Sequence, residues 1–122
     1  MVDIQSISTG LKLGEDGIWY GSGNQNISYP AGGNEACFAV EDSSFWFGHR
    51  NNCIASIVGS YPPANNGTIF DIGGGNGFVS LGLVNAGFDV ALVEPGRVGA
   101  SKAKNRGLKD VICATANTAN FK

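Results

Sequence analysis

The sequence predicts an α/β protein with a parallel sheet, and four features of residues 68–95 support this prediction. Residues 68–72 (TIFDI) form a short apolar run, four glycines fall within positions 73–77, and residues 78–86 are apolar enough to pack on a sheet. Residues 89–94 then give VALV between two acids, which is typical of a buried parallel strand. A strand, a glycine turn, a helix and a second strand make a βαβ unit. Ligands of such units lie beyond the carboxyl ends of the strands.

The spacing of the glycines restricts the kind of ligand. A dinucleotide-binding turn has glycine at its first, third and sixth positions, but the sixth position counted from Gly73 is Phe78. A phosphate-binding P-loop is also excluded, because no Gly-Lys-Ser/Thr follows the glycines. What remains is Asp-x-Gly-x-Gly-x-Gly over residues 71–77, with Glu94 placed 17 residues after the last glycine. A carboxylate there can accept hydrogen bonds from both ribose hydroxyls, and it would repel a 2′-phosphate.

This arrangement resembles motif I and the following acidic position of class I S-adenosylmethionine (SAM)-dependent methyltransferases. SAM has no phosphates, so it needs no Lys or Arg clamp near the glycine turn. The resemblance implies that the cofactor is SAM or S-adenosylhomocysteine. It also implies that the cofactor contacts the strand ends and the turn, at Asp71, Gly73, Gly74, Gly75, Gly77, Glu94 and Pro95. The alternative is a plain structural turn.

A helix is expected before the sheet. Residues 44–58 carry apolar side chains at helical spacing, with Asp42 or Ser43 as the expected N-cap. Gly59 and the two prolines at 62–63 should end this helix.

The start of this helix adds to the resemblance. Trp-Phe-x-x-Arg-Asn at residues 46–51 is similar to an element that many bacterial methyltransferases of this class carry just before the core sheet. By this resemblance Trp46 and Phe47 cover the cofactor, and Arg50 meets the carboxylate of its methionine part. A guanidinium matches a carboxylate in geometry as well as charge. Otherwise, Arg50 is exposed and pairs with a nearby acid.

The C-terminal part predicts a further helix and strand. Residues 98–106 form a short helix that Gly107 ends, and residues 110–114 form a third strand. In the family, a tract after this strand commonly carries an Asp that accepts the adenine amino group. Thr115 falls at that position here. The resemblance therefore leaves the backbone of Thr115 and Ala116 to contact adenine.

Three segments describe the expected organisation. Residues 1–40 are a β-rich extension with a small hairpin built from residues 17–21 and 26–29, residues 41–63 are a cap helix, and residues 64–122 are a SAM-binding Rossmann-like half-domain. The resemblance implies a methyltransferase fold of which the chain supplies only the first half of the sheet, ending after the third core strand. The methyl acceptor and the catalytic residues, expected beyond that strand, stay unknown.

The half-sheet has a consequence for assembly. In the complete fold the strand at 68–72 is central, so here its backbone groups on one side would be unpaired. We therefore expect a homodimer or a swapped assembly, or else the N-terminal segment lying beside this strand.

Composition excludes several other classes. The net charge of −2 and the pI near 5.1 do not indicate a nucleic-acid binder, and the five basic residues within 97–109 are interpreted as a solvated helix face. Three widely spaced cysteines without a CxxC pair predict free thiols in a reducing compartment and no metal site. No apolar run approaches the length of a membrane span. We therefore predict a cytoplasmic protein.

These observations together predict the cofactor-binding portion of a SAM-dependent methyltransferase. A non-catalytic nucleoside-binding or interaction module of the same fold is the main alternative. An NAD-type domain is a weaker one, because the sixth-position glycine is absent.

Overall fold

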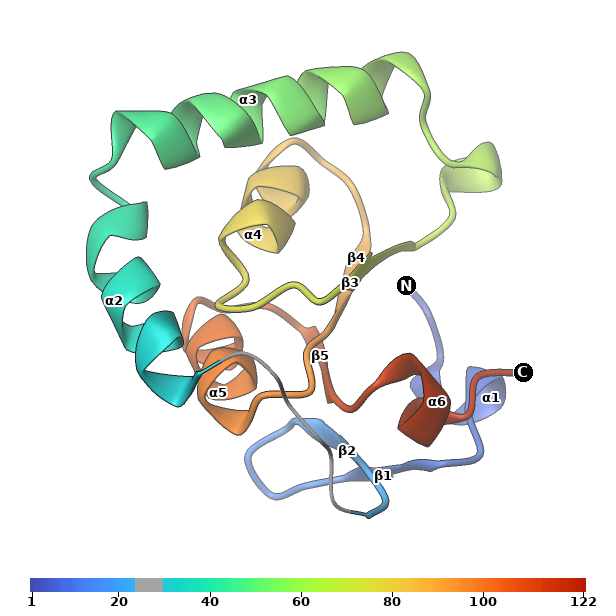
Figure 1. Ribbon diagram of the computed structural model, residues 1–122. Coiled ribbons are helices and arrows are strands. Elements are labelled where there is room, and N and C mark those ends of the chain that lie inside the picture. Colours follow the sequence, from blue (N-terminus) through green and yellow to red (C-terminus); the bar gives the residue numbers. More distant parts are fainter. Residues whose placement is uncertain (24–29) are drawn as a thin grey trace.

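The computed structural model of the protein describes residues 1–23 and 30–122, which fold around one mixed sheet (Figure 1). Five strands lie in the order β1-β2-β5-β4-β3. The strands are β1 (Leu11–Leu13), β2 (Trp19–Gly21), β3 (Ile69–Ile72), β4 (Val90–Val93) and β5 (Asp110–Cys113). The helices are α1 (Ile4–Ile7), α2 (Ala31–Glu41), α3 (Phe45–Ser60), α4 (Phe78–Asn85), α5 (Arg97–Asn105) and α6 (Ala116–Ala119), with a 3-10 turn at Ala64–Asn66.

Three parallel strands form the core of the sheet, so the predicted α/β class is confirmed. β4 lies between β3 and β5, with Ile69 opposite Val90 and Val93 opposite Ile112. All four residues of β4 are buried, as expected for a parallel strand covered on both faces.

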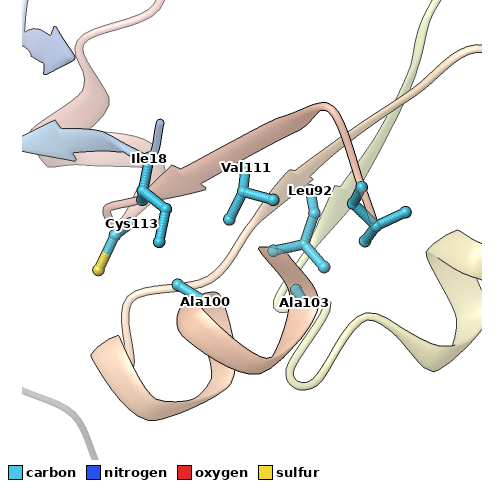
Figure 2. Packing of buried hydrophobic residues seen from close by; sticks show 7 residues of the cluster. Ile18, Leu92, Ala100, Ala103, Val111 and Cys113 are labelled. Atoms are coloured by element: carbon cyan, nitrogen blue, oxygen red, sulfur yellow. The ribbon is translucent and has the colours of Figure 1, made fainter. Parts of the chain in front are cut away.

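Each face of the sheet has its own apolar cluster. On one face, α5 packs small residues against Leu92 and Val111 (Figure 2). Ala100 and Ala103 are fully buried there and allow the helix to approach the strands closely. On the other face, Ile4 and Ala119 bring α1 and α6 against Val93 and Ile112.

The N-terminal segment differs from the prediction. Its hairpin joins β1 to β2, whereas the sequence suggested strands at 17–21 and 26–29; residues 26–29 lie outside the described residues. β2 then pairs in parallel with β5, because buried Ile18 and the half-buried side chain of Trp19 join the two clusters on either side of β5. The alternative expectation, that this segment lies beside the strand at 68–72, is therefore wrong.

The segment 1–40 is also less β-rich than predicted, because α2 was missed. Two consecutive glycines at 32–33 and a proline at position 30 are weak helix formers and concealed it. Pro30 is in fact the N-cap of α2, where its missing amide costs no intrahelical hydrogen bond. Glu41 and Asp42 therefore end α2 instead of beginning the next helix, whose N-cap is Ser44.

The next helix, α3, extends further than expected. It continues through Gly59 to Ser60, and the prolines at 62–63 follow its end. The strands predicted at 68–72, 89–94 and 110–114 and the helices predicted at 78–86 and 98–106 agree with the structure to within about two residues. The short helices α1 and α6 were not predicted.

Candidate ligand site

A cavity of about 690 Å³ opens at the carboxyl ends of β3 and β4. One wall is the glycine turn between β3 and α4, and the opposite wall comes from α2 and α3. Of the residues predicted from the sequence, those that line it are Phe47, Arg50, Asp71, Gly73, Gly74, Gly75, Glu94 and Pro95. This is the position at which ligands of open α/β sheets bind.

The glycine turn leaves space on the cavity side. Gly75 has a φ of +56°, and a Cβ built on it would meet no atom within 4 Å. Gly77 has a different role, because a Cβ on it would come within 2.8 Å of Ala103 and 2.7 Å of Leu108. Gly77 therefore allows the turn to pack against α5, and it does not line the cavity.

The Glu94 carboxylate connects the turn to the next helix. Its Oε2 accepts a hydrogen bond from the Gly75 amide at 2.9 Å, and its Oε1 accepts one from the Gly96 amide at 2.7 Å. Only 9% of Glu94 is exposed. A carboxylate offers about four acceptor positions, so capacity for ligand hydroxyls is left on the same two oxygens.

Asp71 is fixed at the end of β3. Its Oδ2 accepts a hydrogen bond at 2.6 Å from the hydroxyl of Ser80, which is fully buried in α4. Asp71 also lines the cavity, so its position beside the turn is set before any ligand arrives.

Arg50 reaches the cavity from α3. Its guanidinium carbon lies 4.9 Å from the centre of the Phe47 ring, which also lines the cavity. The Arg50 Nε is buried and has no hydrogen-bond partner in the described part of the chain. α3 is held in place by Asn51, whose Nδ2 donates to the Phe78 carbonyl oxygen at 2.8 Å. The alternative of an exposed, acid-paired Arg50 is not what the structure shows.

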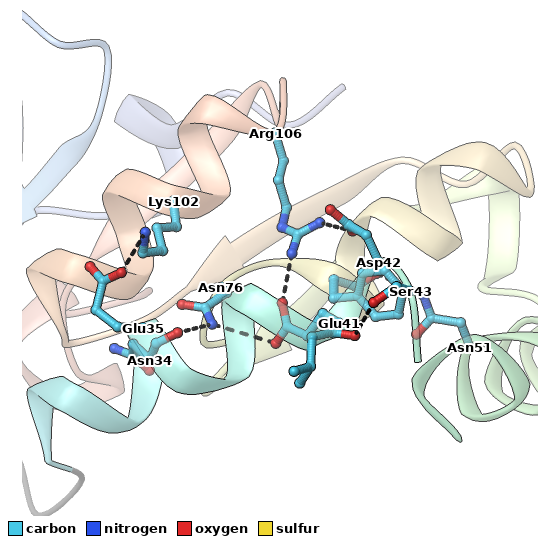
Figure 3. Close-up of polar contacts among 11 residues, drawn as sticks. Asn34, Glu35, Glu41, Asp42, Ser43, Asn51, Asn76, Lys102 and Arg106 are labelled. Carbon is cyan, nitrogen blue, oxygen red and sulfur yellow. Dashed lines mark hydrogen bonds and ion pairs between the residues drawn. The ribbon is translucent and has the colours of Figure 1, made fainter. Parts of the chain in front are cut away.

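A polar network ties α2 to the glycine turn (Figure 3). The Asn76 Nδ2 donates to the Asn34 carbonyl oxygen at 2.8 Å and to Glu41 at 3.4 Å. Arg106, at the end of α5, donates to Glu41 and Asp42 at 2.6 Å each. The Arg106 side chain is only 6% exposed, so the expectation that the basic residues of 97–109 form a solvated face is wrong for this residue.

Other predicted residues lie away from the cavity wall. Trp46 is 64% exposed, so the structure does not place it over the site. Thr115 is the N-cap of α6 and exchanges hydrogen bonds with Thr118, and Ala116 follows it. Cofactor contact by these residues and by Gly77 stays a prediction.

Several cavity residues were missed by the sequence reasoning. Asn34, Cys37 and Glu41 lie on α2, and Asn76 is the one non-glycine residue within positions 73–77. The position of Asn76 inside the motif was a usable signal. No sequence signal marked the three residues on α2, because the helix itself was not recognised.

The charges around the cavity are mixed. Among the described lining residues, Arg50 supplies a cation and Glu41, Asp71 and Glu94 supply carboxylates. Such a wall suits a ligand that carries both an anion and a cation, and it is unfavourable for a polyphosphate.

No known family model matches this sequence, and no curated protein matches it either. In the described ranges, 1–23 and 30–122, no helix is both long and apolar enough to span a bilayer. Within the same ranges, no group of acidic, histidine and cysteine side chains is arranged to hold a metal ion.

Proposed function

We propose that the cavity binds SAM or S-adenosylhomocysteine and that the chain is the cofactor-binding portion of a methyltransferase. One observation carries this proposal: the glycine turn, the Glu94 carboxylate and the Arg50 guanidinium line a single cavity. They come from three separate elements, because Arg50 lies on α3, the turn follows β3 and Glu94 follows β4. A plain structural turn would not require a distant arginine to share its cavity.

The residues present fit this cofactor in three respects. The space at Gly75 lets a ligand approach the backbone closely, where a Cβ would otherwise project. Glu94 has acceptor capacity left for two ribose hydroxyls. The Arg50 Nε is a buried donor without a partner among the described residues, and a carboxylate would satisfy it.

In the proposed reaction, the cofactor and the chain have different roles. When bound, SAM supplies an activated methyl group on its sulfonium. The chain's residues bind and orient: Glu94 would hold the ribose, Arg50 would hold the methionine carboxylate, and Asp71 lies close enough to the turn to favour a cation there. Transfer then depends mainly on placing an acceptor in line with the methyl group. The parallel order β5-β4-β3 supports the finer proposal of a methyltransferase-type sheet.

A non-catalytic module of the same fold is the second candidate. It would use the same cavity to bind a nucleoside, and the residues that line the cavity account for binding without any transfer step. Binding alone therefore does not separate the two candidates, and a methyl-transfer assay with candidate acceptors does.

Calorimetric titration of the chain with S-adenosylhomocysteine, adenosine and NAD⁺ tests the binding proposal. We expect S-adenosylhomocysteine to bind most tightly, adenosine to bind more weakly, and NAD⁺ not to bind, because its phosphates meet carboxylates. Equal binding of NAD⁺, or no binding of either adenosine ligand, would contradict the proposal.

A further inference from the structure

Asn34, in the first turn of α2, carries a buried side-chain amide that the described chain does not use. The residue is 8% exposed and lines the cavity. Its backbone carbonyl oxygen accepts from Asn76, but its side-chain amide forms no hydrogen bond within residues 1–23 and 30–122. Buried side-chain amides normally have partners. A ligand in the cavity can supply the missing one.

The Asn34 amide lies close to the Glu94 carboxylate. A Cβ built on Gly96 would lie 2.9 Å from Oε1 of Glu94 and 3.6 Å from Nδ2 of Asn34. A Cβ built on Gly99 would lie 3.1 Å from Cγ of Glu94 and 3.2 Å from the same Nδ2. Two positions without side chains therefore let α2 approach the residue that follows β4. The amide and the carboxylate border the same space.

Contacts on either side fix the position of Asn34. The Asn76 Nδ2, inside the glycine turn, donates to the Asn34 carbonyl oxygen at 2.8 Å (Figure 3). The next residue, Glu35, forms an ion pair with Lys102 of α5, with Oε2 and Nζ 3.1 Å apart. The start of α2 is thus held against both the turn and α5 before a ligand arrives. A group that is already in position loses less entropy when it binds.

The two side chains have complementary hydrogen-bonding properties. An ionised carboxylate such as that of Glu94 only accepts, whereas the side-chain amide of Asn34 has two donor hydrogens. A hydroxyl is both a donor and an acceptor. One hydroxyl between them can therefore donate to Glu94 and accept from Asn34 at the same time.

We propose that Asn34 is a specificity-determining residue of the cavity, and that its Nδ2 donates to a ribose hydroxyl that itself donates to Glu94. This inference rests on the proposed function, because it takes the ribose to lie at Glu94. A ligand that lacks this hydroxyl leaves the Asn34 amide buried and unpaired. A ligand that carries an O-methyl group there cannot donate to Glu94. The cavity should therefore select ribonucleosides whose hydroxyls are both present and unmodified.

Calorimetric titrations of the whole chain with S-adenosylhomocysteine and with its 2′-deoxy and 3′-deoxy forms test the contact. Asn34→Ala should weaken S-adenosylhomocysteine about three- to tenfold, which is the effect of one neutral hydrogen bond. The same substitution should leave the affinity for one of the two deoxy ligands unchanged, because that ligand already lacks the contacted hydroxyl. An equal effect on all three ligands, or no effect on S-adenosylhomocysteine, would overturn the proposal.

Two further variants separate hydrogen bonding from packing. Asn34→Asp keeps the shape of the side chain but replaces the donor with an acceptor, so it should weaken S-adenosylhomocysteine at least as much as Asn34→Ala. Wild-type affinity in Asn34→Asp would mean that Asn34 acts by shape alone and would overturn the proposal. The matched control is Asn52→Ala on α3, an exposed residue away from the cavity wall, which should leave the affinity unchanged. Thermal melts show that each variant is folded at the temperature of the titration.

The Glu94→Ala variant distinguishes failure of this inference from failure of the proposed function. If S-adenosylhomocysteine binds the wild-type chain and Glu94→Ala weakens it, the ligand lies at this carboxylate. Unchanged affinity in Asn34→Ala would then overturn the Asn34 contact alone. If S-adenosylhomocysteine does not bind the wild-type chain, the proposed function and this inference are both wrong.

Discussion

Arg106 and Glu41 form an ion pair in which both side chains are more than nine-tenths buried, with Nη2 and Oε2 2.6 Å apart. The guanidinium carbon also lies 4.6 Å from the centre of the Phe38 ring and 5.2 Å from that of Phe78. Because the other oxygen of Glu41 accepts from Asn76, this pair joins the end of α5 to α2 and to the glycine turn. The wall of the cavity therefore depends on a residue that does not line it.

Removing Arg106 should strongly destabilise the protein. Arg106→Ala leaves Glu41 buried without its cation, and breaking one partner of a buried ion pair costs about 3–5 kcal/mol. We expect a decrease of this size in the free energy of unfolding, measured by chemical denaturation.

The matched control is an exposed ion pair between α2 and α5. The Lys102 Nζ lies 3.1 Å from Oε2 of Glu35, whose side chain is 64% exposed. Glu35→Gln should therefore cost no more than about 1 kcal/mol. Equal losses in the two variants would show that burial of the Arg106 pair has no special effect.

Glu94→Ala should reduce both stability and affinity. The carboxylate accepts from the amides of Gly75 and Gly96, and hydrogen bonds to a charged group contribute about 1.5–3 kcal/mol. The structure predicts a loss of about 2–3 kcal/mol in the free energy of unfolding.

Affinity for S-adenosylhomocysteine should fall by about one to two orders of magnitude in the same variant. Calorimetry well below the melting temperature separates this effect from unfolding. Glu94→Gln keeps one acceptor oxygen and should lose less stability. Unchanged affinity in a folded Glu94→Ala protein would rule out ribose binding by this carboxylate.

Arg50→Ala should distinguish between two ligands. If Arg50 holds the methionine carboxylate, S-adenosylhomocysteine should bind about ten- to a hundredfold more weakly, while adenosine, which lacks that carboxylate, should bind as before. Arg50→Lys keeps the charge and loses the planar fork, so it should show an intermediate loss. Equal weakening of both ligands would instead indicate a defect in the packing of α3.

Two glycines of the turn should respond differently to alanine. Gly75→Ala places a methyl group in open cavity space at a positive φ. It should lower the free energy of unfolding by about 1–2 kcal/mol and weaken ligand binding. Gly77→Ala adds a clash with Ala103 and Leu108 and should cost more, about 2 kcal/mol or above. Thermal melts and calorimetry of both variants check this order, and the reverse order would contradict the assigned roles.

The βαβ unit could be predicted from sequence because its signals are local. The VALV run, the glycine turn and the acid at position 94 depend on residues close together in the chain. The helix α2 could not be predicted, since its glycines disfavour a helix and its ion pair with Arg106 forms across 65 positions. Such tertiary contacts override weak local propensity.

The residues of the site also divide into those with a signal in the sequence and those placed only by the tertiary fold. The turn and Glu94 were found from spacing, and Arg50 was found through a resemblance. Asn34 and Glu41 reach the cavity only because α2 folds back over the turn. No pattern in the sequence carries that information.

Tyr20 provides a test of the hairpin that extends the sheet. Its hydroxyl donates to Asp16 at 2.6 Å, and this hydrogen bond, with a smaller effect of burial, raises the pKa of Tyr20 to about 12. A raised pKa means that the folded state favours the neutral phenol. The stabilising contribution is therefore fully present below the ordinary tyrosine pKa of about 10, and it is lost as the pH rises through about 12.

The difference between the ultraviolet titrations of the wild-type protein and Tyr20→Phe isolates this residue. We expect Tyr20 to ionise with a pKa of about 12 in the wild-type protein. In Asp16→Asn its pKa should return toward about 10, because the acceptor carboxylate is gone. Circular dichroism across the same pH range shows whether the chain is still folded when Tyr20 ionises. Ionisation near pH 10 in a folded wild-type chain would mean that the bond to Asp16 does not form, and that β2 is held beside β5 by Ile18 and Trp19 without it.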